Sequence, residues 1–514
     1  MFDISRISEY REDNRLEAKK AAGGLPDSLW DTYSAFANTN GGMILLGVEE
    51  LKDKSLKVVG VPNAEAQLKA FWDTVNNRTK VSVNILRGDN VSVEAVDGKS
   101  VIVINVPRAV RQDKPAYIKG NVYSGSYRRN GEGDYHCSAS EVKNMVRDSG
   151  DITQDRLILD KTPMSVFCDE TIAKYRTRFL NLKPKHVWAN IPTEEFLLKI
   201  GAIKRSEEDN AFHPTVAGLL MFGYDYEILN EFPNYFLDYR EKFGTEGERW
   251  SDRIVSSTGD WSGNVYDFYF RIQDKITSDL KIPFKLENGR DRIDDTPIHE
   301  AVREALTNAL VHSDYYERRG LVVEKRKDGI VISNPGALRI APTEALNGGV
   351  SDPRNGTMML MLALVGIGER AGSGLANIRS VWKRQNWNVP KLQEQFNPDR
   401  TVLTLPLTEN VGENDESVGE NDENVGESEQ NVGENDENVG VNGENVGVKL
   451  SKTEQQALEL IMKNGELTQE AIGDRLNRDK RTIERVMRKL RENGLIERIG
   501  SDRQGVWRII RHAD

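Results

Sequence analysis

An acidic repeat between Glu409 and Gly447 most constrains how this chain can fold. Valine followed by glycine recurs every seven residues from Val411 to Val446, and the segment holds 13 acidic and no basic residues. One valine per repeat cannot supply both apolar positions of a coiled coil, and the adjacent glycine disfavours a helix. Low hydrophobicity with one sign of charge predicts a disordered linker over residues 408–448, with an acidic interaction tail as the alternative. The chain is therefore expected to fold as separate parts on either side of it.

The charge of the chain is concentrated in that repeat. The net charge of the 514 residues is -11, so removing the 13 acidic residues leaves -11 + 13 = +2 for the rest. From Lys449 to the C-terminus, 15 basic residues face 11 acidic ones, a net of +4. The C-terminal part can therefore approach phosphate groups, whereas the acidic total by itself would argue against nucleic acid.

Several features predict a cytoplasmic location away from membranes. Only Cys137 and Cys168 are present, the N-terminal segment has no apolar signal region, and no apolar run is long enough to cross a bilayer. A length of 514 residues exceeds what one hydrophobic core organises. We expect a multidomain protein of α/β and α+β type, with domains at residues 1–147, 148–285, 286–407 and 449–514.

The chemistry-bearing residues cluster in the third of these domains. Glu304 and Asn308 lie four residues apart in a predicted helix, so they share one helical face. A carboxylate there can orient water, and an amide oxygen can bind Mg²⁺ that bridges phosphates. A solvated polar face explains the spacing equally well, so the pair is informative only in combination with motifs further along the chain. These are Asn334 and Gly336 after a predicted strand, then Arg354, then Gly372 and Gly374 before a second predicted helix.

These blocks, in this order, resemble the N, G1 and G2 boxes of GHKL ATPases, and more narrowly the divergent ATPase of "RecG-related" bacterial regulators. The resemblance implies a Bergerat-type α/β sandwich that binds ATP and Mg²⁺. It implies Glu304 as the general base, Asn308 as the Mg²⁺ ligand, Asn334 and Gly336 on the adenine side, and Arg354, Gly372 and Gly374 as further nucleotide contacts. Asn334 stands where the family has aspartate, and it can accept a hydrogen bond but supplies no charge.

The N-terminal domain resembles the Schlafen AlbA-like domain, through Glu12 to Lys20 and the segment from Ser34 to Glu50. The resemblance implies two alternatives. One is a nucleic-acid-binding domain, for which Lys19, Lys20, Arg128 and Arg129 are candidate contacts. The other is a metal-dependent nuclease acting on RNA or DNA, which would use Glu12, Glu17 and Glu49, with Glu50 as an alternative to Glu49.

The last 66 residues show the pattern of a winged helix-turn-helix domain. Helices are predicted over Lys452–Lys463, Gln469–Leu476 and Lys480–Glu492, and Gly494 follows the third of them. Two predicted strands then flank a polar turn at residues 500–505. In the third helix Ile483, Val486, Met487 and Leu490 form an apolar stripe, so the basic side chains lie on other faces. The candidate DNA contacts are Arg478, Lys480, Arg481, Arg485 and Arg503.

Taken together, the sequence predicts an ATP-binding, DNA-binding transcriptional regulator that forms homo-oligomers, with RNA as an alternative partner. Nucleotide would close residues 348–374 over the phosphates and so change association and nucleic-acid affinity. Two other functions stay open. One is a Schlafen-like nuclease in phage defence, and the other is a degenerate ATPase that acts as a scaffold.

Overall fold

A computed structural model describes residues 4–243, 250–278, 296–368, 374–396 and 398–409 continuously, together with short pieces and single residues elsewhere. The chain forms two units, Met1–Asp415 and Glu416–Asp514, and each is described by itself. The division falls inside the acidic repeat. The residues of the repeat beyond Glu409 lie outside the described residues, as does the prediction of a linker there.

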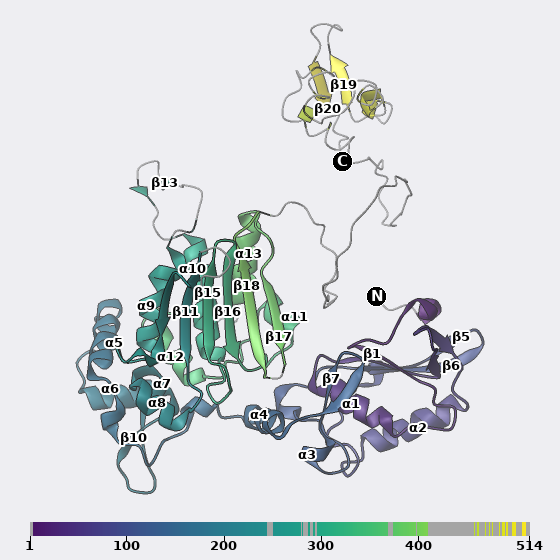
Figure 1. Ribbon diagram of the computed structural model, residues 1–514, viewed down its shortest axis with the longest axis horizontal. Coiled ribbons are helices and arrows are strands. Elements are labelled where there is room, and N and C mark those ends of the chain that lie inside the picture. The colour runs from purple at the N-terminus through teal and green to yellow at the C-terminus, as the bar shows by residue number, and fades with distance from the viewer. Residues whose placement is uncertain are drawn as a thin grey trace. The chain divides into compact units, whose positions relative to one another are not determined.

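The N-terminal domain is built on a four-stranded sheet with the strand order β1-β2-β6-β5 (Figure 1). β1 runs parallel to β2, and the other neighbours are antiparallel. The central β6 has alternating side chains buried in two different cores: Ile102 and Ile104 on one face, Val101 and Val103 on the other. Its apolar sequence is thus typical of a strand covered on both faces. The strands are β1 (Leu16–Lys19), β2 (Gly42–Leu46), β5 (Val91–Val96) and β6 (Lys99–Val106).

Helices and hairpins surround this sheet. The helix that begins at Ser28 ends at Asn38, before Gly41, whose φ of +72° turns the chain into β2. Asn38 is buried. Its side-chain amide nitrogen donates hydrogen bonds to the carbonyl oxygens of Ala116 and Tyr127, and its side-chain oxygen accepts one from the Ala116 amide. The other elements are η1 (Ile4–Glu9), α1 (Ser28–Asn38), β3 (Val48–Glu50), β4 (Leu56–Val58), α2 (Ala64–Val75), η2 (Gly88–Asn90), η3 (Arg111–Asp113), α3 (Val122–Gly125), β7 (Tyr127–Asn130), β8 (Gly133–His136) and α4 (Ala139–Ser149).

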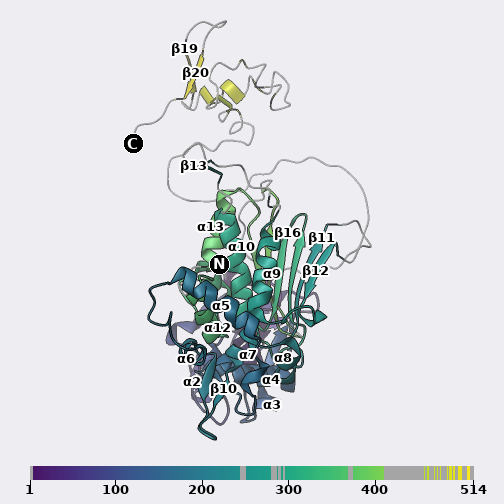
Figure 2. The ribbon, with the colours of Figure 1, turned by 90° about the vertical axis from the view of Figure 1, so that its left-hand side faces the viewer.

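The second sheet has six strands in the order β12-β11-β15-β16-β18-β17. β11 and β15 are parallel, and the other neighbours are antiparallel. Three long helices, α9, α10 and α13, lie on one face of this sheet (Figures 1 and 2). The bounds are β11 (Leu237–Lys242), β12 (Asp252–Val255), α9 (Val265–Thr277), α10 (Pro297–His312), β15 (Leu321–Arg326), β16 (Gly329–Pro335), α11 (Pro342–Asn347), α12 (Gly356–Leu364), α13 (Gly374–Arg384), β17 (Lys391–Gln395) and β18 (Arg400–Pro406).

The domain boundary expected at residues 285/286 falls between strands of this one sheet, so the two predicted domains share it. β11 and β12 come from the region expected to form a connecting domain, yet they pair with β15 from the predicted ATP-binding domain. One hydrophobic core also runs from Val166 to Leu405. Helices of the segment that precedes β11 contribute to this core, among them α5 (Asp169–Leu182), α6 (Thr193–Ile200) and α7 (Val216–Phe222). The remaining elements of the segment are η4 (Gln154–Arg156), η5 (Met164–Val166), β9 (Ile203–Arg205), β10 (Phe212–Pro214) and α8 (Asp225–Glu231). Between β12 and α10 the chain also forms η6 (Ser256–Thr258), β13 (Leu286–Glu287) and β14 (Asp291–Arg292).

The C-terminal unit carries the predicted hairpin of a wing, β19 (Ile496–Ile499) paired with β20 (Val506–Ile509). The apolar stripe of the third predicted helix is confirmed, because Ile483, Val486, Met487 and Leu490 are all buried in one core with Trp507. Among the described residues of the whole chain, none of the helices combines the length and the apolar character that a bilayer span needs.

Candidate functional site

The structure brings Glu304, Asn308 and Gly374 together where α10 meets the beginning of α13. The Asn308 amide nitrogen lies 3.3 Å from Glu304 Oε1 and donates a hydrogen bond to it. A Cβ atom on Gly374 would stand 2.5 Å from Glu304 Oε1 and 2.8 Å from Asn308 Nδ2. Any larger residue at this position would have to displace the ends of both side chains from the beginning of α13. Gly372 lies outside the described residues.

This arrangement has the parts that phosphate chemistry needs. α13 is an 11-residue helix whose first amides begin at Gly374 and attract negative charge. Beside them, Glu304 offers a carboxylate and Asn308 an amide oxygen, which are the hard oxygen ligands that Mg²⁺ prefers. The described residues contain no group of three His, Cys, Asp or Glu that could hold a metal ion by itself. A magnesium ion at this place would therefore need oxygen atoms from the phosphates as well as from Asn308 and Glu304.

Asn334, Gly336 and Arg354 form a second group at the end of β16. Asn334 is buried and pairs with Thr401 of β18. Gly336 has a φ of +95°, and a Cβ atom there would lie 2.7 Å from Arg354 Nη1. Arg354 donates to the carbonyl oxygen of His312, at the end of α10, at 2.5 Å. The second group is thus joined to the helix that carries Glu304 and Asn308.

Arg354 has a structural role that its place in the sequence did not indicate. Its guanidinium forms two hydrogen bonds with Asp148 of α4, at 3.0 and 2.6 Å, and a third with the carbonyl oxygen of Ala337 at 3.0 Å. The side chain is only 6% exposed. Arg354 therefore links α10 and the β16 loop to the N-terminal domain, and these bonds occupy the donors that were expected to contact nucleotide.

His312, beside Arg354, should make the stability of the protein depend on pH. Desolvation, reinforced by the guanidinium groups of Arg354 and Arg339, lowers the pKa of His312 from 6.5 to about 4. Between these two values the unfolded chain binds a proton that the folded protein does not, so the free energy of unfolding falls as the pH falls. The loss amounts to at most about 3 kcal/mol. In urea unfolding measured from pH 7 to 4, His312→Gln should weaken this dependence, and an unchanged slope would contradict the assignment.

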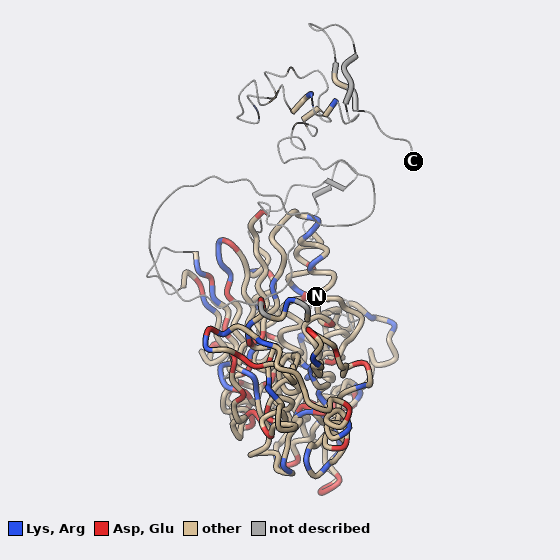
Figure 3. The backbone as a smooth tube through the Cα atoms, turned by 90° about the vertical axis from the view of Figure 1, so that its right-hand side faces the viewer, with Lys and Arg blue, Asp and Glu red and all other residues tan. Residues whose placement is uncertain are grey.

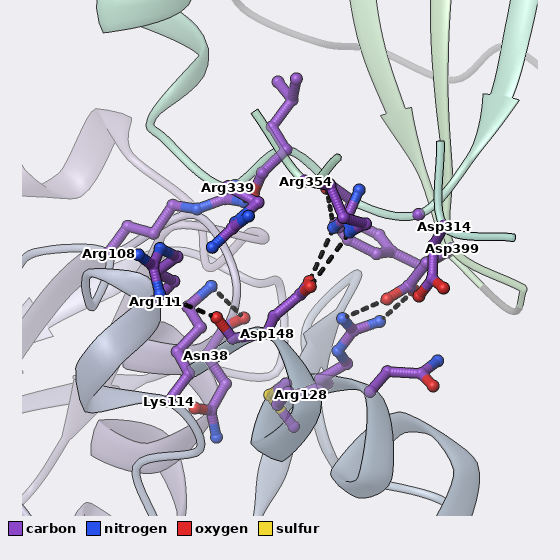
Figure 4. Close-up of a pocket in the computed structure, with 16 residues that line it drawn as sticks. Asn38, Arg108, Arg111, Lys114, Arg128, Asp148, Asp314, Arg339, Arg354 and Asp399 are labelled. Carbon is purple, nitrogen blue, oxygen red and sulfur yellow. Dashed lines mark hydrogen bonds and ion pairs between the residues drawn. The ribbon is translucent and has the colours of Figure 1, made fainter. Parts of the chain in front are cut away.

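A pocket lies where the N-terminal domain meets the loops of the second sheet (Figure 4). Ion pairs cross this junction at short distances. Arg128 contacts both oxygens of Asp399, at 2.5 and 2.8 Å, and Arg111 Nε lies 2.6 Å from Asp352 Oδ2. Arg108 pairs with Glu394 in the same way. The sequence did not point to this junction, because each pair joins residues more than 200 positions apart.

The N-terminal acidic residues do not form the predicted metal cluster. Glu49 pairs with Lys20 at 3.0 Å, and Glu17 lies between Lys19 at 2.8 Å and Arg129 at 2.9 Å. Burial raises the pKa of Glu12, and the nearby Glu17 and Glu50 raise it further, while a hydrogen bond from the Ala18 amide opposes them. The third acid near Glu12 is thus Glu50 rather than Glu49. Glu17, Glu49 and Glu50 are paired with lysine or arginine, and Glu12 accepts a hydrogen bond from the Ala18 amide, so this arrangement gives no support to a metal-dependent nuclease.

The predicted nucleic-acid contacts Arg128 and Arg129 need correction, because both are buried. Their relative exposures are 8% and 4%. Arg129 pairs with Glu17 and Asp134 and stacks over the Phe36 ring, 5.2 Å from its centroid. The tyrosine and glycine around them in the sequence suggested an exposed basic loop, whereas they belong to β7, which packs against α1. Buried and paired guanidinium groups cannot reach a nucleic-acid backbone.

The remaining predicted contacts differ in exposure. Lys20 is exposed, whereas Lys19 is largely buried beside Glu17. In Figure 3 the basic and acidic positions of the first unit are interspersed on the side shown. Arg475, Arg488 and Arg491 of the C-terminal unit are exposed. The DNA contacts predicted in this unit lie outside the described residues: Arg478, Lys480, Arg481, Arg485 and Arg503.

Four family models match successive parts of the chain. Residues 7–138 match "Schlafen, AlbA_2", and residues 143–238 match a domain of unknown function. Residues 320–405 match "Putative ATP-dependent DNA helicase recG C-terminal". Residues 447–511 match "Sugar-specific transcriptional regulator TrmB". The third match begins at β15 and so includes Asn334, Gly336 and Arg354, but not α10 with Glu304 and Asn308.

Two solved structures are also similar to the chain. The crystal structure of the DIP2311 protein from Corynebacterium diphtheriae is 18% identical, with 99% of this chain and 94% of that chain covered and a TM-score of 0.39. The solution structure of the N-terminal domain of a RecG-related protein from Nitrosomonas europaea is 30% identical, with 27% of this chain and 94% of that domain covered and a TM-score of 0.22. No curated protein matches the chain.

Proposed function

We propose that this chain, whose successive parts match models for Schlafen AlbA_2, the RecG C-terminal domain and the TrmB regulator, is an ATP-binding, DNA-binding regulator in which bound nucleotide controls DNA affinity. The observation that carries the proposal is the meeting of Glu304 and Asn308 with Gly374 at the beginning of α13. A carboxylate, an amide oxygen and helix amides at one place suit a Mg²⁺–triphosphate group.

In this proposal the residues of the chain divide the work. The amides at the beginning of α13 would bind the phosphates of a nucleotide, and Asn308 would hold the magnesium ion through its amide oxygen. Glu304 orients a water molecule, and its carboxylate accepts a proton from that water if the nucleotide is hydrolysed. Asn334 stands where an adenine-side acceptor is expected and supplies no charge, so binding is a stronger expectation than rapid hydrolysis.

α10 connects this site to the N-terminal domain. Glu304 and Asn308 lie along the helix, and its last residue, His312, accepts the hydrogen bond from Arg354 that also binds Asp148 of α4. A change in the position of α10 on nucleotide binding would therefore act directly on the domain junction. The winged helix supplies the proposed DNA contact, and association of two chains would add a second contact and raise the affinity.

The proposal predicts that ATP changes the DNA affinity of the full chain. Fluorescence anisotropy with labelled duplex DNA should show a change in Kd of about tenfold when ATP and Mg²⁺ are added, a typical coupling between two sites. Asn308→Ala should remove this effect and leave the nucleotide-free Kd unchanged. Asn230→Ala, at an exposed position of α8, is the matched control and should respond to ATP like the wild type.

Two outcomes would contradict the proposal. An equal Kd with and without ATP would separate DNA binding from the nucleotide and favour a scaffold. Cleavage of the labelled DNA, or of labelled RNA in a parallel sample, that depends on Mg²⁺ or Mn²⁺ and disappears in Glu17→Ala would place the activity in the N-terminal domain.

A further inference from the structure

We propose that the pocket at the junction of the N-terminal domain and the second sheet is a binding site for a single tetrahedral oxyanion, with inorganic phosphate as its representative (Figure 4). The anion would contact basic side chains from both sides of the junction and hold them together. This site is separate from the nucleotide site proposed at Glu304, Asn308 and Gly374, because none of those three residues lines the pocket.

The lining of the pocket has an excess of basic side chains. Six of the lining residues are basic and three, Asp148, Asp314 and Asp399, are acidic. The basic ones are Arg108, Arg111, Lys114 and Arg128 from the N-terminal domain, and Arg339 and Arg354 from the loops of the second sheet. Like charges that converge on one cavity favour a ligand of the opposite charge.

Four of the six basic side chains are already paired, and one of these is Arg111, whose Nε lies 2.6 Å from Asp352 Oδ2. Arg128 is bound to Asp399, and Arg354 to Asp148, through two hydrogen bonds each. Arg108 contacts both oxygens of Glu394 and also donates to the carbonyl oxygen of Leu338 at 2.7 Å. These four ion pairs form the walls of the pocket, and most of the hydrogen-bonding groups of their side chains are satisfied within the protein.

Arg339 and Lys114 have fewer partners. The Arg339 side chain is 4% exposed, and its Nε has no hydrogen-bond acceptor among the described residues. Its Nη1 donates to the carbonyl oxygen of Pro353 at 2.9 Å, and the nearest carboxylate oxygen, from Asp352, lies 3.5 Å from Nε and is shared with Arg111. Lys114 Nζ donates to the carbonyl oxygen of Asn38 at 3.0 Å. A guanidinium group has five donors and an ammonium group three, so both can bind a further acceptor.

The electrostatics of these two side chains agree with a missing negative charge. Desolvation holds the pKa of Lys114 well below its usual range, and Arg108 lowers it further while Glu394 opposes this effect. Desolvation also lowers the pKa of Arg339, against the attraction of Asp352 and Asp148. A buried cation without sufficient counter-charge is costly, and an oxyanion between the two would remove that cost.

The size of the pocket suits a small anion. Its volume is about 40 Å³, whereas a cavity needs about 10–15 Å³ on the same scale to hold one water molecule. The space thus corresponds to a few water molecules or to one tetrahedral group such as phosphate. Guanidinium and ammonium groups are the usual protein partners of phosphate oxygens.

The test is thermal unfolding of the full chain with added sodium phosphate, compared with sodium chloride at equal ionic strength. Phosphate at about a hundred times its Kd should raise the Tm by about 3–8 °C. Lys114→Met should abolish this rise and should not lower the Tm of the phosphate-free protein, because it removes a cation that the free pocket does not fully neutralise. Arg339→Gln should also abolish the rise.

The controls distinguish this site from screening by salt and from the nucleotide site. Lys57→Met and Arg87→Gln, both at exposed positions, should keep the full phosphate response. Asn308→Ala should keep it too, so that failure of the proposed nucleotide site leaves this test valid. Sulfate should act like phosphate. An equal effect of chloride, the absence of a shift in the wild type, or a full shift in Lys114→Met would each overturn the proposal.

Discussion

Replacing Asp399 by alanine is expected to lower the free energy of unfolding of the first unit by about 3–5 kcal/mol. Asp399 binds both terminal nitrogens of Arg128, at 2.5 and 2.8 Å, and the two side chains are only 7% and 10% exposed. The guanidinium group also lies over the Phe396 ring, 4.8 Å from its centroid, so it cannot turn to water without disturbing that contact. Removing the carboxylate leaves the buried guanidinium with only the longer ion pair to Glu141, at 3.2 Å, so its desolvation is less well compensated and stability is lost.

Urea unfolding followed by tryptophan fluorescence would measure this loss, and two further variants make it interpretable. Glu132→Ala removes an ion pair with Lys54 of similar length, 2.7 Å, but both partners are more than half exposed, so the loss should be only a small fraction of that for Asp399→Ala. Replacing both buried partners, Arg128→Met with Asp399→Leu, should recover much of the stability because no charge is left unpaired. A loss for Asp399→Ala as small as that for Glu132→Ala would show that the junction is not closed in solution.

Replacing Gly374 by valine is expected to weaken the proposed binding of ATP and Mg²⁺ by about 100-fold, or about 2.7 kcal/mol. A Cβ atom at this position would lie 2.5 Å from Glu304 Oε1 and 2.8 Å from Asn308 Nδ2. Both contacts are to the ends of flexible side chains, so these side chains can move aside and the fold should remain. The displaced groups are the ones assigned to water and magnesium, and the added methyl groups would cover the amides at the beginning of α13.

Isothermal titration calorimetry of the full chain with ATP and Mg²⁺ would measure this effect. Gly88→Val is the matched control, because a Cβ atom on Gly88 has no neighbour within 4 Å, and it should bind nucleotide like the wild type. Circular dichroism should show that both variants keep the wild-type helical content. Unchanged affinity in Gly374→Val would mean that nucleotide, if bound, does not occupy the meeting point of α10 and α13.

Local patterns accounted for many individual elements. Glu304 and Asn308 lie on one helix as predicted, α10 (Pro297–His312). The stripe of Ile483, Val486, Met487 and Leu490 is buried as expected. These predictions hold because helix periodicity, capping residues and apolar spacing act over a few neighbouring residues, which a sequence displays directly.

Predictions that depended on distant residues were less accurate. The boundary at 285/286 separated β11 from β15, although the two strands are neighbours in one sheet. Arg128 and Arg129 were expected at the surface. Instead, Arg128 forms an ion pair with Asp399, 271 positions away, and the Arg129 guanidinium stacks over the Phe36 ring. The sequence shows that a charge is present, and burial and pairing appear only when distant segments meet.

The sequence by itself determined the modular order, the helix with Glu304 and Asn308, the glycine at position 374 and the apolar stripe of the third C-terminal helix. Each of these depends on residue type and short-range spacing alone. Only the tertiary structure decided that α10 and α13 bring Glu304, Asn308 and Gly374 together. It also decided that Arg354 connects α10 with Asp148 through hydrogen bonds, and that Arg339 and Lys114 line one pocket. The reason is physical: the energy of a charge depends on its surroundings in space, and the residues that provide those surroundings here lie far apart along the chain.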